Sequence, residues 1–195
     1  MSKSLRAFVA AAALATAAIA SPVFAPLSAT AALAQDNPMV GGAPMYADKN
    51  IVENAVNSKD HTTLVAAVQA AGLAETLSGP GPFTVFAPTN AAFEALPAGT
   101  VDTLLKPENK DQLTKVLTAH VVPGKVSAAD LAAGIKAGNG KFNMTTVSGD
   151  ALTAEMKGDK VVIMDESGGS AEVTIADVNQ SNGVIHVVDK VLLPK

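Results

Sequence analysis

The sequence contains no cysteine and no tryptophan, and its 195 residues include a single tyrosine and six phenylalanines. A chain without cysteine forms no disulfide, has no thiol nucleophile and offers no cysteine for a lipid anchor, so its stability must come from packing. Lysine and arginine are also few, 14 against 18 acidic residues, which gives a net charge of −4. We therefore expect no nucleic-acid partner, because phosphate binding requires concentrated basic residues.

The amino-terminal segment has the layout of a secretory signal. Lys3 and Arg6 precede an uncharged, alanine-rich run over residues 7–20, and residues 32–34 (Ala-Leu-Ala) supply the small side chains of a cleavage site. The run is shorter than the roughly 20 residues that a membrane-spanning helix needs. We predict a cleaved signal peptide over residues 1–34, no membrane span, and secretion to the periplasm, the cell surface or the medium.

Removal of the signal leaves 161 residues with a net charge of −6, enough for one domain with a substantial core. Residues 35–48 are rich in glycine, proline, alanine and methionine without a steady period, which predicts a flexible leader. Beyond it, apolar residues recur at helical spacing, and Asp60 and Ser127 are good N-cap residues. The expected helices lie over residues 51–56, 61–71, 91–96, 107–119 and 128–133.

The carboxyl-terminal third has the character of β-strands. Short β-branched or apolar segments are separated there by Gly, Asp, Ser and Asn, and residues 157–160 (Lys-Gly-Asp-Lys) favour a hairpin turn. The expected strands lie over residues 83–86, 142–147, 151–156, 161–164, 173–176 and 184–193. Together these elements predict a single α+β domain over residues 49–195, in which several short helices pack on one side of a mainly antiparallel sheet.

Three motifs in this region resemble those of fasciclin domains. The first signature is similar to residues 83–93 (FTVFAPTNAAF), the second to residues 182–194 (NGVIHVVDKVLLP), and the central motif to residues 120–124 (HVVPG). The resemblance implies a fasciclin-like fold, a wedge of helices on a β-sheet. We expect the signature residues to be core, turn or capping residues rather than catalytic ones; they are Phe83, Phe86, Pro88, Thr89, Asn90, Phe93, His120, Asn182, Gly183 and His186.

The resemblance also implies a candidate contact site. In vertebrate matrix members of the family, an Asp-Ile pair shortly before the second signature is linked to integrin binding, and the corresponding residues here are Asp177 and Val178. A Tyr-His pair in the central motif is a second determinant in those members, but Ala119 precedes His120 in this chain. We therefore carry over only Asp177 and Val178 as candidate adhesion contacts.

The three histidines offer no metal-site spacing. His120 lies on the apolar face of a predicted helix and His186 lies inside an apolar strand, so we interpret both as hydrogen-bonded core residues, whereas His61 beside the cap Asp60 is expected to be solvated. The sequence has no Gly-x-Ser-x-Gly elbow and no glycine-rich phosphate loop before a helix. We predict no catalytic residue, no metal and no cofactor, and therefore no enzyme.

Two function hypotheses follow from these observations. The resemblance and the signal favour a secreted, non-enzymatic adhesion or recognition module that binds a protein or surface polymer at cells or matrix. The alternative is a periplasmic binding protein for a small apolar or lipid ligand, held in a groove between the aliphatic helices and the sheet.

Overall fold

The computed structural model describes residues 37–194, and the signal peptide predicted over residues 1–34 lies outside them. Among the described residues, no helix is both long and apolar enough to cross a membrane. The α-helices are α1 (Ile51–Asn57), α2 (Thr62–Ala71), α3 (Ala74–Ser78), α4 (Asn90–Glu94), α5 (Thr100–Leu104), α6 (Lys110–Thr118) and α7 (Ala128–Ala137), with single 3-10 turns at Lys59–His61 and Pro107–Asn109.

Side-chain caps explain where several helices begin. Asn50 and Glu53 form a reciprocal capping box at α1, and Ser127 and Asp130 form another at α7. Helix α2 ends at Gly72, whose φ of 74° is the left-handed conformation that glycine adopts at low cost. Ser127 therefore caps α7 as its sequence predicts, whereas the prediction of Asp60 as the N-cap of α2 is wrong: Asp60 lies in the 3-10 turn, and α2 begins after His61 without a side-chain cap.

Seven strands form one mixed, mostly antiparallel sheet in the order β4-β3-β9-β8-β7-β6-β5. Strands β3 and β9 pair in parallel, with Phe83 opposite Gly183, and the other neighbours are antiparallel. The two ends of the sheet approach each other, because the Val147 amide donates to the Val121 carbonyl at 2.8 Å. The strands are β3 (Phe83–Pro88), β4 (Val121–Pro123), β5 (Lys141–Thr145), β6 (Ala151–Lys157), β7 (Lys160–Met164), β8 (Ser170–Gln180) and β9 (Gly183–Val188).

The predicted α+β class and mainly antiparallel sheet are confirmed, including the hairpin turn in which Lys157 pairs with Lys160. The last strand is shorter than expected: β9 ends at Val188, and the chain continues to residue 194 without regular structure. The amides of Leu192 and Leu193 there bond to the side chains of His120 and Asp165 instead of to a neighbouring strand.

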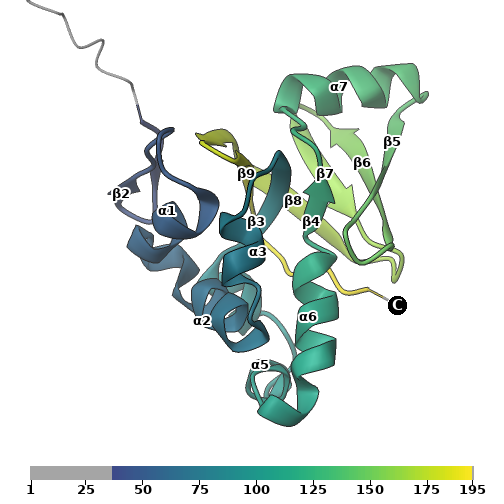
Figure 1. The fold of residues 1–195 in the computed structure, drawn as a ribbon. Helices are drawn as coiled ribbons and strands as arrows, with labels where there is room; N and C mark the ends of the chain where they lie inside the picture. Colours follow the sequence, from purple (N-terminus) through teal and green to yellow (C-terminus); the bar gives the residue numbers. More distant parts are fainter. Residues whose placement is uncertain (1–36, 195) are drawn as a thin grey trace, which may run out of the picture. The chain divides into compact units, whose positions relative to one another are not determined.

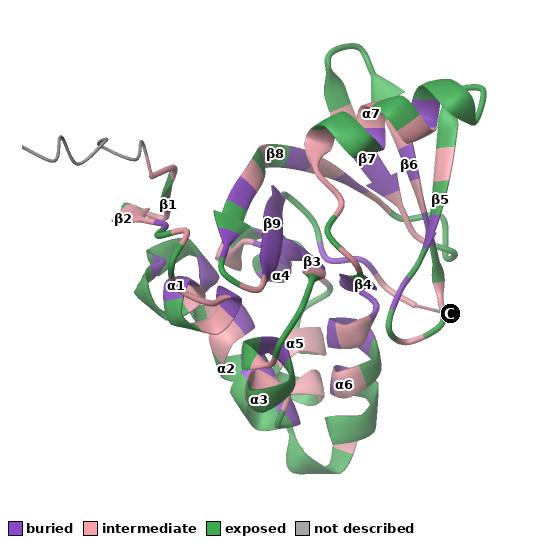
Figure 2. Ribbon diagram, turned by 45° about the horizontal axis from the view of Figure 1, so that its top comes forward, coloured by how far each residue is buried: buried purple, intermediate pink, exposed green. Residues whose placement is uncertain are grey.

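The apolar residues form two cores on this frame. Helices α1 to α6 gather around β3 and β9 and enclose the first core, whereas α7 lies across β5, β6 and β7 and encloses the second (Figure 1). Strand β9 is buried along its whole length (Figure 2), because helices cover one of its faces and the other turns toward the second core. The second signature thus forms the centre of the domain.

Residues 37–48 do not form the flexible leader that their composition suggested. Strands β1 (Met39–Val40) and β2 (Ala43–Pro44) make a hairpin that buries Val40 and Met45 in the first core. The fully buried Asn54 side chain holds this hairpin by accepting from the Tyr46 amide at 3.0 Å and donating to the Tyr46 carbonyl at 2.7 Å. The domain therefore begins before residue 49.

Candidate functional site

Asp177, the first of the two candidate contact residues, lies in an irregular part of β8. The pairing of β8 with β9 shifts register between Val173 and Val178, and Asp177 has a φ of 56°. Its carboxylate accepts a hydrogen bond at 2.7 Å from the amide of Ala128, the first residue of α7. A carboxylate at this position stabilises the helix amino terminus, so the half-buried Asp177 positions α7 on the sheet.

Val178, the second candidate, is fully buried and belongs to the first core. It therefore offers no surface to a partner, which corrects the expectation that Asp177 and Val178 act together as a contact pair. The residues directly on either side of the pair, Ala176 and Asn179, are exposed. The side chain of Asn179 donates to the Asp177 carbonyl at 3.1 Å.

His186 supports the bulge from β9. Its Nδ1 accepts from the Asp177 amide at 3.3 Å, which leaves the proton on Nε2 to donate to the Val126 carbonyl at 2.8 Å. The ring stacks on Phe86 with 5.6 Å between centroids. Burial lowers the pKa of His186, although the Val126 carbonyl and the Asp177 carboxylate act in the opposite direction. The structure thus places a neutral, structural histidine here.

His120 joins two segments that are distant in the sequence. Its Nδ1 donates to the Val116 carbonyl at 2.7 Å, and its Nε2 accepts from the Leu192 amide at 2.9 Å. Both nitrogens are therefore used by the neutral ring. Burial lowers the pKa of His120 to about 4, more than the Val116 carbonyl and Asp165 can offset. His120 anchors the carboxyl-terminal segment to α6 and has no free atom for chemistry.

The first signature places its polar residues at helix starts. Thr89 caps α4 by accepting from the Ala92 amide at 3.3 Å. Asn90 accepts from the Thr63 amide at 3.0 Å and donates to the Lys59 carbonyl at 2.9 Å, which fixes the start of α2 against α4. Of the apolar signature residues, Phe86 and Phe93 are buried and Phe83 is half-buried, and Pro88 closes β3.

The second signature begins with a similar side-chain clamp. Asn182 donates to the carbonyls of Leu77 at 2.7 Å and Gly79 at 3.0 Å, and it accepts from the Ile51 amide at 3.1 Å. A side chain at Gly183 would collide with the Phe83 backbone, so glycine is required where β9 passes β3. These contacts tie α1 and α3 to the last strand.

The comparison with known families agrees with this geometry. Residues 59–194 match the model of the Fasciclin domain. The chain therefore belongs to the fasciclin family. The match covers all three motifs and most of the two cores, whereas the β1–β2 hairpin and α1 precede it.

Similar fasciclin proteins occur in bacteria. The chain is 54% identical over 144 residues to protein sll1483 of Synechocystis sp., covering 74% of this chain and 73% of that protein. It is 35% identical over 145 residues to immunogenic protein MPB70 of Mycobacterium bovis, covering 72% and 66% respectively.

A solved structure shows the same fold. The FAS1 domain pair from the insect cell adhesion molecule Fasciclin I matches with a TM-score of 0.65 at 18% identity, over 74% of this chain and 51% of that chain. At this low identity the likeness establishes the fasciclin fold alone.

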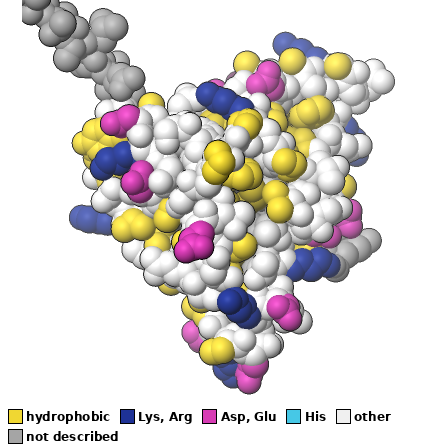
Figure 3. Space-filling view, viewed as in Figure 1, with side chains coloured by type: hydrophobic (Ala, Val, Ile, Leu, Met, Phe, Trp, Pro, Cys, Tyr) yellow, Lys and Arg dark blue, Asp and Glu magenta, His cyan; other side chains and the backbone are white. Residues whose placement is uncertain are grey.

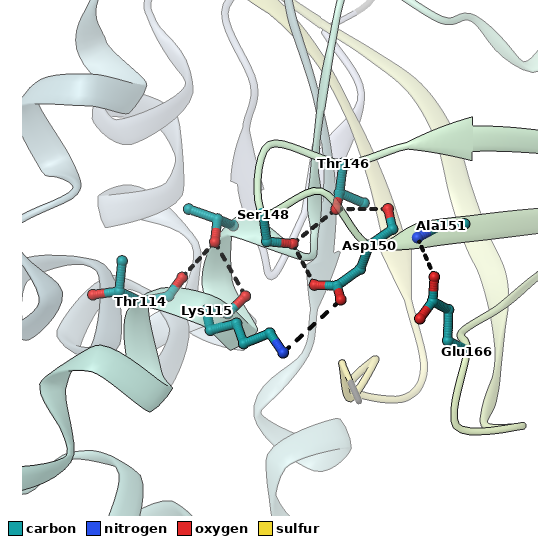
Figure 4. A network of polar contacts seen from close by, with 8 residues as sticks. Thr114, Lys115, Thr146, Ser148, Asp150, Ala151 and Glu166 are labelled. Carbon is teal, nitrogen blue, oxygen red and sulfur yellow. Dashed lines mark hydrogen bonds and ion pairs between the residues drawn. The ribbon is translucent and has the colours of Figure 1, made fainter.

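A polar network links the β5–β6 turn of the fasciclin domain to α6 (Figure 4). The Ser148 hydroxyl donates to the Asp150 carboxylate at 2.6 Å, and the hydroxyls of Thr146 and Ser148 lie 2.8 Å apart. Lys115 of α6 approaches the other carboxylate oxygen of Asp150 at 4.0 Å. Among the residues that the structure describes, the Ser148 hydroxyl contacts only the Asp150 carboxylate and the Thr146 hydroxyl, with no histidine among its partners, so we assign the network a structural role in holding the turn.

His61 is another residue whose predicted position is wrong. It was expected in solvent but is buried, with 3% of its surface exposed, and its Nδ1 lies 2.8 Å from the Ser58 hydroxyl. A usable signal was present, because His61, Leu64 and Val68 lie at i, i+3 and i+7, the spacing of one apolar helix face. Burial lowers the pKa of His61, while the Ala87 carbonyl and Asp60 raise it.

Two neighbouring apolar cavities lie in the first core, and one of them reaches His61. The first, of about 30 Å³, lies between α1, α2 and β3 and reaches His120. The second, also about 30 Å³, lies beneath the β1–β2 hairpin and reaches His61. They share Ile51, Ala55, Leu64 and Val85 as lining residues. Over the described residues 37–194, no group of three or more His, Asp or Glu side chains is placed to hold a metal ion.

Proposed function

We propose that the protein is a secreted, non-enzymatic adhesion or recognition module that binds a protein or surface polymer outside the cytoplasm. Membership of the fasciclin family over residues 59–194 carries this proposal. The fold is shared with a protein described as an insect cell adhesion molecule. In addition, the polar signature residues Asn90, His120, Asn182 and His186 are occupied by internal hydrogen bonds, so their geometry supports a structural rather than a catalytic role.

The contact surface that we propose is the bulge of β8. Ala176 and Asn179 are exposed there, and the half-buried Asp177 sets their position through Ala128 and His186. Elsewhere, the face drawn in Figure 3 carries acidic and basic side chains interspersed with apolar ones rather than a single charged patch. This mixed charge distribution is consistent with recognition through the shape of the β8 bulge rather than through a large charged patch.

Attachment assays with three variants test this surface. Asn179→Ala removes an exposed side chain and is expected to reduce attachment while changing the free energy of unfolding by less than about 0.5 kcal/mol. Asp177→Asn keeps a side-chain oxygen for the Ala128 amide but removes the charge, whereas Asp177→Ala also removes the hydrogen bond that positions α7. We expect reduced attachment for both, and a lower melting temperature chiefly for Asp177→Ala.

Asp102→Asn in the exposed part of α5 is the matched control, because it makes the same chemical change on another element. Attachment should equal that of the unmodified protein for this control. Full attachment by folded Asn179→Ala and Asp177→Asn would remove the β8 bulge from the contact surface.

A second function is favoured by the adjoining cavities. Their lining is almost wholly apolar, as expected for a site that receives a small apolar or lipid ligand. Native mass spectrometry of the protein purified from its own host tests this function, and a bound apolar molecule is the expected result. Protein that carries nothing, and whose melting temperature no ligand of an apolar panel raises, would exclude it.

A further inference from the structure

Among the described residues, a single buried side-chain nitrogen or oxygen has no hydrogen-bond partner, and it belongs to His61. Its Nδ1 is satisfied by Ser58, but no donor or acceptor meets hydrogen-bond geometry at Nε2. The Ala87 carbonyl is close enough to raise the pKa of the ring, but it does not meet hydrogen-bond geometry at Nε2. Buried polar atoms in folded proteins are nearly always paired, so an unpaired one indicates a missing partner.

His61, which carries this nitrogen, lines the cavity beneath the β1–β2 hairpin. Val40 and Met45 of the hairpin cover this cavity, and Val85, Ala87, Val178 and Ile185 of the sheet form its floor. Apart from His61 and Ser58, every lining side chain is apolar. The neighbouring cavity continues along α1 and α2, where Val52 and Val65 are only partly buried, so the apolar space extends toward the surface.

We propose that the two cavities form one binding cleft for a neutral aliphatic molecule with a single hydroxyl group, and that His61 Nε2 is the hydrogen-bonding partner of that hydroxyl. This inference rests on the second function proposed above and specifies its ligand. The aliphatic chain lies along Ile51, Ala55 and Leu64, which border both cavities.

The hairpin must move outward for such a molecule to enter, because each cavity of about 30 Å³ has room for little more than a water molecule. Few polar contacts oppose this movement. Asn54 holds the Tyr46 backbone, and the Lys59 amide donates to the Gly41 carbonyl at 3.2 Å. Displacement of the hairpin exposes the same cleft that Val40 and Met45 cover.

The cleft discriminates against the corresponding carboxylic acid. No cationic side chain lines either cavity, and the buried imidazole of His61 is neutral near pH 7 because its pKa is lowered. A carboxylate would therefore lose its hydration without gaining a counter-charge, whereas a hydroxyl loses far less. A hydrogen bond that satisfies a buried, otherwise unpaired group is worth about 5- to 150-fold in affinity.

The test compares 1-octanol with octanoate at pH 7, because they have equal chain length and differ in the polar group. Two-dimensional NMR of the imidazole nitrogens is expected to show a saturable shift of His61 Nε2 with 1-octanol and none with octanoate. The melting temperature should rise with the alcohol. His61→Phe, which keeps a buried aromatic ring, should weaken 1-octanol binding at least about fivefold, and the neighbouring Asp60→Asn should leave it unchanged.

Each other outcome overturns the inference in a recognisable way. Saturable alcohol binding without a shift at Nε2, or with equal affinity for octanoate, would show that His61 is not the anchor while leaving the apolar cleft in place. Absence of binding by either compound in the unmodified protein would exclude both the anchor and the second function. Neither result bears on adhesion, which the attachment assays measure separately.

Discussion

Buried histidines lie where distant segments of the chain meet. His120 connects α6 to Leu192, and His186 connects the β8 bulge to Val126. Each uses both ring nitrogens in the neutral form, one as donor and one as acceptor. The histidines of the fasciclin motifs therefore contribute to the fold through hydrogen bonds that only an unprotonated ring can make.

Replacement of His120 by alanine should be strongly destabilising. It removes a packed ring and leaves the Leu192 amide and Val116 carbonyl without their partners, which should lower the free energy of unfolding by about 2 kcal/mol or more. Chemical denaturation measures the change. Gln112→Ala, at an exposed position of the same helix, is the control and should change stability by less than about 0.5 kcal/mol. An equally small effect at His120 would contradict its structural role.

The histidines also predict how stability depends on pH. The pKa of each is lowered by burial, to about 4 for His120, whereas unfolded histidine titrates near 6.5. The unfolded chain therefore binds more protons between these values, so stability is complete above about pH 6.5 and falls as pH decreases toward 4. Melting temperatures measured from pH 8 to 4.5 should show this decline. A melting temperature that stays constant down to pH 5 would contradict it.

Single-residue predictions succeeded where a periodic pattern carried them and failed where tertiary packing intervened. The apolar face of α6 and the apolar strand β9 correctly indicated buried positions for His120 and His186. A family motif predicts a contact role for Val178, but its side chain lies in the core next to the strand bulge. A bulge depends on long-range strand pairing, and no local sequence signal predicts it as strongly as a periodic pattern predicts a buried face.

At the level of elements, the amino-terminal hairpin shows how short segments escape prediction. Its strands have two residues each, too few to establish a period, although Gly41-Gly42 between them is a known hairpin signal. Val40, Met45 and Asn54 make it part of the first core. The hairpin is the cover of the cleft proposed above.

The two glycines of the turn provide a matched test of hairpin docking. Both have positive φ, 58° at Gly41 and 75° at Gly42, so alanine meets similar backbone strain at either position, about 1 kcal/mol. A side chain at Gly41 would also collide with the Ser58 hydroxyl and the Asp60 amide, whereas nothing lies within 4 Å at Gly42. Gly41→Ala should therefore lower the melting temperature more than Gly42→Ala and increase amide exchange in residues 39–46. Equal effects of the two variants would indicate that the hairpin is not docked.

For the whole molecule, the division into a helical first half and a strand-rich second half predicted the fold class. The parallel pairing of β3 with β9 joins the two signatures, residues 83–88 and 183–188, and no local pattern reveals it. The near closure of the sheet through Val121 and Val147 is equally non-local. Periodicity and capping residues predict elements, whereas strand order and cavities depend on contacts between distant segments.

Attachment by living cells measures the central function most directly. A strain that lacks the gene should lose attachment to surfaces, other cells or host tissue, and the unmodified gene should restore it. The Asn179→Ala gene should restore it only in part, although its product folds normally. Full attachment by the deletion strain would contradict the adhesion function and leave ligand binding as the function that the structure supports.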